Sequence, residues 1–198
     1  MPKNKFRLTK TLLDSWIYSF KRDTGYEDFI KTLNREKIQP NKKMLLGQQF
    51  ENCVNGVLNG NYISPNHEWY DGIMLMAEHV QGSQQQVVLF RDIKVDGINF
   101  MMHGVLDYLR AGIVFDCKFT KNYTLNHYLN STQHPVYMYL VPEARQFEYC
   151  ISDGKYLYIE KYPREIIPDL EPIIKYFMAY LDRHNLVDTY VEHWRVNE

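Results

Sequence analysis

The sequence has few of the features that mark secreted, membrane-spanning or metal-cluster proteins. It contains only three cysteines, Cys53, Cys117 and Cys150, and none of them forms a CxxC pair. An odd, scattered set argues against a disulfide scaffold, a structural zinc site and a four-cysteine iron–sulfur cluster. No apolar run approaches the roughly 18 residues of a transmembrane helix, and the N-terminus lacks an apolar signal core. We therefore expect a cytoplasmic protein without a membrane partner.

An excess of basic residues is also missing. The 23 Lys and Arg residues face 24 Asp and Glu residues, so the net charge is −1 and the isoelectric point is about 6.7. The chain therefore lacks the global positive field of many nucleic-acid-binding proteins. Any contact with DNA would come from a local basic groove, or the lysines form an ordinary solvated face. The candidates for such a groove are Lys3, Lys5, Arg7, Lys10, Lys42 and Lys43.

The length and apolar content suit one domain spanning residues 1–198. Hydrophobic residues make up 45% of the chain, enough for a sizeable core, and a second independent domain is not expected. Apolar spacing predicts N-terminal helices within 1–60, a core over about 41–160 and a C-terminal helix over about 163–184. The expected fold class is α/β (α+β), with a mixed central sheet flanked by helices.

Periodicity predicts most of the individual elements. Helical spacing indicates helices after Thr9, over 26–33, over 42–58 with Pro40-Asn41 before it, over 67–81 and over about 128–140. Apolar runs bounded by turn residues indicate strands. These runs are 87–95, 98–102, 105–109, 113–119, 147–152 and 155–161.

The most informative stretch is a predicted hairpin whose apolar strands carry charged residues. Asp107 interrupts the first strand, Asp116 and Lys118 interrupt the second, and Arg110-Ala111-Gly112 links the two. Side chains alternate between the faces of a strand, so Asp116 and Lys118 share one face. A carboxylate in a half-buried sheet is costly unless it is paired or binds a cation.

Two interpretations of these charges stay open. Two carboxylates supply hard oxygen ligands for Mg²⁺ or Mn²⁺, and a lysine two residues after Asp116 can orient an attacking water or stabilise charge on a phosphate. That arrangement predicts phosphodiester hydrolysis. In the structural alternative, Asp107 pairs with Lys118 and Asp116 closes a turn.

Two helical pairs add candidate residues. In the helix over 42–58, Gly47 and Glu51 lie one turn apart beside an apolar stripe, and a glycine inside a helix often marks close approach of another backbone. Further along, Gln133 and Tyr137 lie one turn apart and can present an amide and a phenol together. The structural alternatives are an exposed helical Glu51 and ordinary packing of Gln133 and Tyr137.

Four motifs stand in one order: Gly47-x-x-x-Glu51, Gly104-Val105-Leu106-Asp107, Asp116-Cys117-Lys118 and Gln133-x-x-x-Tyr137. This series resembles the PD-(D/E)XK nuclease superfamily, particularly its RecB-type and lambda-phage-exonuclease-type branches. Residues 47–52 look more like the phage form, because RecB-type members commonly place a histidine where Glu51 stands. The resemblance spans about residues 41–140 and implies a restriction-endonuclease-like core. Leu106 in place of proline, and Asp116 in place of glutamate, depart from the superfamily pattern.

The resemblance implies a role for each matching residue. Asp107 and Asp116 would bind Mg²⁺ or Mn²⁺, with the backbone carbonyl of Cys117 as a further ligand. Glu51 would complete the metal shell directly or through water, and Lys118 would position the attacking water. By the same resemblance, the amide and phenol of the last motif, Gln133 and Tyr137, would hold the nucleic-acid strand or brace the site.

The resemblance implies a metal-dependent deoxyribonuclease, most readily an exonuclease in DNA recombination, repair or phage DNA processing. Its partner would be DNA, with a homo-oligomer such as a ring around DNA and a recombination or phage-replication protein as further expected partners. No iron–sulfur cluster is expected, because the necessary cysteines are missing. Two alternatives remain: a non-catalytic nucleic-acid or protein-binding module on a nuclease fold, and an endonuclease.

Overall fold

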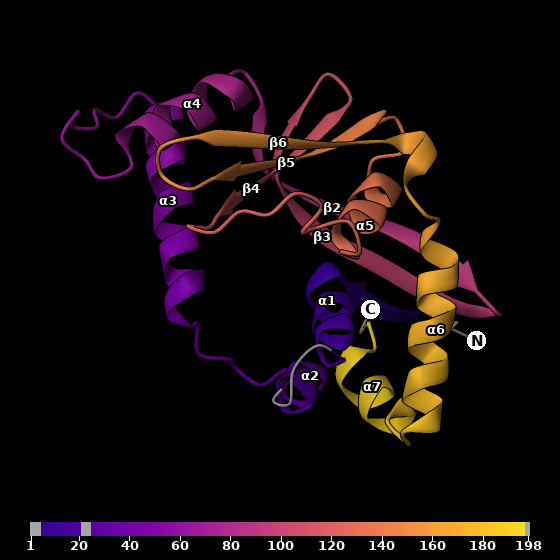
Figure 1. The fold of residues 1–198 in the computed structure, drawn as a ribbon. Coiled ribbons are helices and arrows are strands. Elements are labelled where there is room, and N and C mark those ends of the chain that lie inside the picture. The colour runs from indigo at the N-terminus through magenta and orange to yellow at the C-terminus, as the bar shows by residue number, and fades with distance from the viewer. Residues whose placement is uncertain (1–4, 21–24, 197–198) are drawn as a thin grey trace.

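A mixed sheet of six strands forms the centre of the fold (Figure 1). The structure, a computed structural model, describes residues 5–20 and 25–196. This arrangement confirms the predicted fold class, a mixed sheet flanked by helices. The strands are β1 (Lys5–Thr9), β2 (Gln84–Val95), β3 (Ile98–Arg110), β4 (Ile113–Phe119), β5 (Gln146–Ser152) and β6 (Leu157–Pro163).

Helices on both sides of the sheet divide the apolar core into two clusters. Phe50 of α3 and Ile73 of α4 pack with Tyr108 and Phe115 of the sheet in the smaller cluster. The other helices, with α5 and α6 prominent, enclose the larger cluster (Figure 1). The helices are α1 (Lys10–Tyr18), α2 (Gly25–Leu33), α3 (Lys42–Leu58), α4 (Tyr70–Val80), α5 (Gln133–Leu140), α6 (Leu170–Arg183) and α7 (Val187–Trp194), with a 3₁₀ turn at Arg164–Ile166.

Side-chain caps explain where two of these helices begin. Thr9 caps α1 by accepting a hydrogen bond from the backbone N–H of Leu12, 3.1 Å away. Asn41 caps α3 in the same way, through the backbone N–H of Met44 at 3.0 Å. Short polar side chains at these positions satisfy backbone donors that the first helical turn leaves free.

The long strand β3 organises the sheet. β2 pairs antiparallel with it from Val95↔Ile98 to Gln84↔Leu109 and so occupies one of its two edges. The other edge is shared: parallel β1 pairs with Asn99–His103, and antiparallel β4 pairs with 108–110. Between these two partners lie four residues, 104–107, which pair with no described strand on that edge. This gap in the sheet falls on the motif Gly104-Val105-Leu106-Asp107.

Several predicted elements need correction at their ends. The runs over 98–102 and 105–109 are one continuous strand, because Gly104 lies inside β3 rather than breaking it. The helix expected over 128–140 begins only at Gln133, which places Pro135 in its first turn, where a proline is tolerated. The closing helix begins at Leu170 rather than 163. β1 and α7 were not predicted.

Among residues 5–20 and 25–196, no helix has the length and hydropathy that crossing a membrane requires.

Candidate active site

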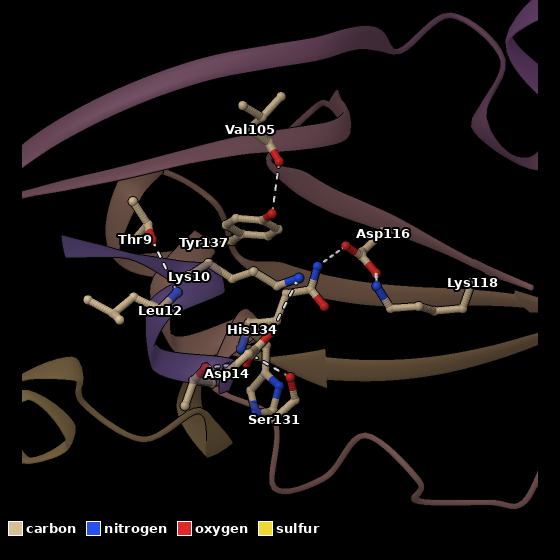
Figure 2. A network of polar contacts seen from close by, with 12 residues as sticks. Thr9, Lys10, Leu12, Asp14, Val105, Asp116, Lys118, Ser131, His134 and Tyr137 are labelled. Atoms are coloured by element: carbon tan, nitrogen blue, oxygen red, sulfur yellow. Dashed lines mark hydrogen bonds and ion pairs between the residues drawn. The ribbon is translucent and has the colours of Figure 1, made fainter. Parts of the chain in front are cut away.

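Asp116 lies on β4, beside the gap in the sheet, and is the most enclosed of the predicted site residues. It is only 1% exposed. The Gln133 side-chain amide on α5 donates a hydrogen bond to Oδ1, and Lys118 Nζ forms an ion pair with Oδ2 (Figure 2). Oδ2 is buried, and the Lys118 ammonium is its partner. Each oxygen of the Asp116 carboxylate is therefore held by a different side chain.

Lys118 shares the α5-facing side of β4 with Asp116, as the strand alternation predicts. Burial lowers the pKa of Lys118, but the charges of Asp116 and Asp107 raise it more, so that it lies above its ordinary value. The side chain keeps 24% of its surface exposed. Lys118 is therefore a permanent cation that can still reach a bound molecule. The alternative pairing of Asp107 with Lys118 does not occur among the described residues; Lys118 pairs with Asp116.

Asp107 stands where β3 and β4 separate. The pairing of the two strands ends at Tyr108↔Phe115. The backbone N–H of Cys117, just past that point, donates a hydrogen bond of 2.8 Å to Asp107 Oδ2. Burial, and then the negative charge of Asp116, raises the pKa of Asp107 to about 8. In the apo protein this carboxyl group therefore holds its proton near neutral pH unless a cation compensates its charge.

Glu51 reaches the same region from α3. Its Oε1 accepts a hydrogen bond of 2.8 Å from Nε2 of Gln86 on β2. Burial, and then the charge of Asp116, raises the pKa of Glu51. Glu51 is therefore coupled to the site rather than being an isolated surface residue.

Gln86 is a site residue that the sequence did not predict. Its backbone has a φ of 50°, in the left-handed region that non-glycine residues seldom adopt. The register places it opposite Asp107, between the pairs Gln85↔Tyr108 and Val87↔Leu106. Three consecutive glutamines precede the predicted strand, and nothing in their spacing distinguishes the third. Only the tertiary contact with Glu51 identifies it.

A groove of about 600 Å³ opens beside Lys118, between α3 and the end of β4. It is lined by Lys43, Gly47 and Glu51 from the helix and by Cys117 and Lys118 from the strand, among others. A Cβ atom added to Gly47 would meet nothing within 4 Å, so the expectation that Gly47 marks a close backbone approach is wrong. Gly47 instead borders the groove that Glu51 and Lys118 also line.

The close approach occurs at Gly104 instead. A Cβ atom there would lie 2.7 Å from Leu140 Cδ1 and 2.9 Å from Tyr137 Cε1. Tyr137 is 5% exposed and donates a hydrogen bond of 2.8 Å to the Val105 carbonyl, in the gap of the sheet (Figure 2). Gln133 and Tyr137 thus contact β4 and β3 from one helix. These contacts have the geometry of a brace, and the strand-holding role stays a prediction.

The donor set around Asp107 and Asp116 suits a hard divalent cation. Both supply carboxylate oxygens, the hard donors that Mg²⁺ and Mn²⁺ prefer, and Asp116 Oδ2 already faces a cation, the Lys118 ammonium. In the described chain, Glu51, Asp107 and Asp116 do not form a group whose ligand atoms all lie within 4.8 Å of one another. His79, Glu148 and Cys150, on the α4 side of the sheet, do form such a group.

Comparison with known proteins supports the fold alone. Neither a protein-family model nor a curated protein matches this sequence. The crystal structure of SSO0001 is similar to this chain, with a TM-score of 0.55 over 93% of this chain and 79% of that one. The two sequences are 14% identical, so the similarity concerns the path of the backbone and not the chemistry of the site.

Proposed function

We propose that this protein is a divalent-metal-dependent deoxyribonuclease, with Asp107, Asp116 and Lys118 at its active site. The observation that carries the proposal is the cluster of two enclosed carboxyl groups and one retained cation at a gap in the sheet. Two acidic groups in one enclosed volume are unfavourable without a compensating cation. A lysine that stays charged beside them suits a phosphodiester substrate.

Each residue has a part that follows from its position. Asp107 and Asp116 would hold Mg²⁺ or Mn²⁺, with Glu51 reaching it directly or through water; the cation would supply Lewis-acid activation and charge neutralisation. Lys118 is free to orient the attacking water and to stabilise charge on the phosphate oxygens. Gln133 keeps the Asp116 carboxylate in one orientation, since it holds Oδ1 by a hydrogen bond.

The cleavage mode is the finer part of the proposal. An exonuclease in recombination, repair or phage DNA processing is supported only by the resemblance of the four motifs, and a cytoplasmic location, a homo-oligomer and a recombination partner have the same standing. Endonuclease activity and a non-catalytic binding module are the competing functions.

Digestion of end-labelled linear DNA and covalently closed circular DNA separates these functions. We expect wild type to degrade the linear DNA with Mg²⁺ or Mn²⁺ and not with EDTA. Lys118→Met should lower the rate at least about 100-fold, a usual cost of losing one charge-stabilising group. Lys121→Met removes an exposed lysine three residues later and should leave the rate unchanged.

The other outcomes are equally specific. Cleavage of closed circles would establish an endonuclease. DNA binding without cleavage of either form would support the binding module, and metal-dependent cleavage that Lys118→Met leaves intact would contradict the proposed site.

A further inference from the structure

The sheet face next to the proposed active site is uncovered over half of β2 and β3. Val88 and Phe90 are each 55% exposed, whereas the residues alternating with them, Val87 and Leu89, pack against the core. The register sets Val88 against Val105 and Phe90 against His103. The alternation of side chains puts these pairs on one face. We call Val88, Phe90, His103 and Val105 the exposed strip.

Phe90 and His103 form a stacked aromatic pair within the exposed strip. Their rings are stacked, with centroids 4.5 Å apart and planes inclined by 16°. Partial burial, and then the charge of Arg7, lowers the pKa of His103, so its imidazole is uncharged at neutral pH. An uncharged, exposed pair of parallel rings resembles the stacking platforms on which proteins hold unpaired bases.

One cation borders this aromatic pair. Arg7 on β1 pairs with Met101, two positions before Thr9, which pairs with His103. Strand alternation puts Arg7 and His103 on the same face of the sheet. The buried Nε of Arg7 has no hydrogen-bond partner in the described chain. A guanidinium group beside a pair of aromatic rings suits a phosphate backbone.

The exposed strip runs directly to the proposed active site. Phe90 is four residues from Gln86 along β2, roughly 13 Å at the usual rise of a strand. Gln86 in turn holds Glu51. A single chain of nucleotides that contacts the aromatic pair could therefore reach Glu51 along this face.

We propose that the exposed strip, with Arg7, binds a single-stranded segment of the DNA substrate, with Phe90 and His103 stacking on its unpaired bases. This inference rests on the proposed function and adds to it the form of the substrate. It predicts that the DNA strand to be cleaved is unpaired where it crosses the protein surface between Phe90 and Asp107.

Binding in EDTA tests the inference without cleavage. The probes are a fluorescein-labelled oligothymidylate and an abasic oligonucleotide of the same length, followed by anisotropy with the full chain. Wild type should bind the oligothymidylate more tightly. Phe90→Leu keeps apolar bulk but removes the ring, and should weaken oligothymidylate binding about 10-fold with little effect on the abasic strand. Tyr176→Leu, which removes a 73% exposed ring on α6, is the matched control.

Arg7→Gln tests separately whether the positive charge beside the exposed strip contributes to binding. It should weaken binding of both oligonucleotides equally and reduce the slope of log affinity against log salt concentration by about 1. Equal wild-type affinity for the two probes, or wild-type behaviour of Phe90→Leu, would overturn the inference and leave a protein partner as the occupant of this face. The anisotropy measurement needs no metal. A failure to distinguish the oligothymidylate from the abasic strand is therefore a separate result from a loss of nuclease activity.

Discussion

Asp107 is the residue whose ionisation should affect stability most directly. Its pKa of about 8 lies well above the ordinary value of 3.8. Between these two pH values the folded protein keeps a proton that the unfolded chain releases. Stability of the metal-free protein therefore falls as the pH rises from about 4 to about 8, and a divalent cation should restore it.

Asp107→Asn should remove this pH dependence, because the amide is neutral and can still accept the hydrogen bond from Cys117 N–H. In EDTA at pH 8 we expect the variant to be more stable than wild type by about 1–3 kcal/mol, with little difference at pH 4. Urea unfolding at both pH values measures this, with Asp182→Asn on α6 as an exposed control. If the unfolding free energy of the variant depended on pH as it does in wild type, Asp107 would not be the group with the raised pKa.

The brace formed by α5 is the feature that matters at the scale of elements. Gln133 and Tyr137, one turn apart, contact β4 and β3 on either side of the gap in the sheet. The helix can approach this closely because Gly104 has no side chain. The gap, and with it the spacing of Asp107 and Asp116, thus depends on the contact between α5 and β3.

A pair of glycine substitutions tests this dependence. Gly104→Ala should destabilise the protein by about 1–3 kcal/mol and lower nuclease activity, because the new methyl group clashes with Tyr137 and Leu140. Gly47→Ala should stabilise α3 by up to about 1 kcal/mol, since its Cβ meets open space and alanine favours the helix. Thermal unfolding of both variants is the measurement. Equal effects would mean that the close approach of α5 is unimportant.

His134, also on α5, gives the helix a pH response in the acid range. Burial lowers its pKa to about 4 from the ordinary 6.5, although the charge of Asp14 opposes the shift. As the pH falls from 6.5 to 4, the unfolded chain binds a proton that the folded protein excludes, so stability falls. His134→Gln should flatten the dependence of unfolding free energy on pH over this interval, and His127→Gln, at an exposed position, should not. A slope in His134→Gln equal to that of wild type would be inconsistent with this reading.

At the scale of the whole molecule, the sequence predicted local elements better than long-range contacts. The strand over 113–119 and the helix over 42–58 have strong periodicity, and both form with the predicted ends. β1 was missed because its five residues acquire their strand structure by pairing with Asn99–His103, far along the chain. A pairing between segments so distant leaves no local signal.

The same limit applies to the candidate site. Asp107, Asp116 and Lys118 were predictable because charges inside apolar strands are conspicuous in the sequence. The ion pair of Lys118 with Asp116, the left-handed backbone of Gln86 and the contact of Gln86 with Glu51 depend on tertiary structure. The His79–Glu148–Cys150 group was also missed, since its members come from α4 and β5 without any motif spacing.

Calorimetric titration with Mn²⁺ tests the central claim most directly, because the proposed site at Asp107 and Asp116 competes with a second group that could hold a metal, His79, Glu148 and Cys150. We expect wild type and Glu148→Gln to bind Mn²⁺ equally, and Asp107→Asn to lose the binding heat. That result would place the cation at the carboxylates in the gap of the sheet. Binding that survives in Asp107→Asn and disappears in Glu148→Gln would contradict the account and place the metal at His79, Glu148 and Cys150.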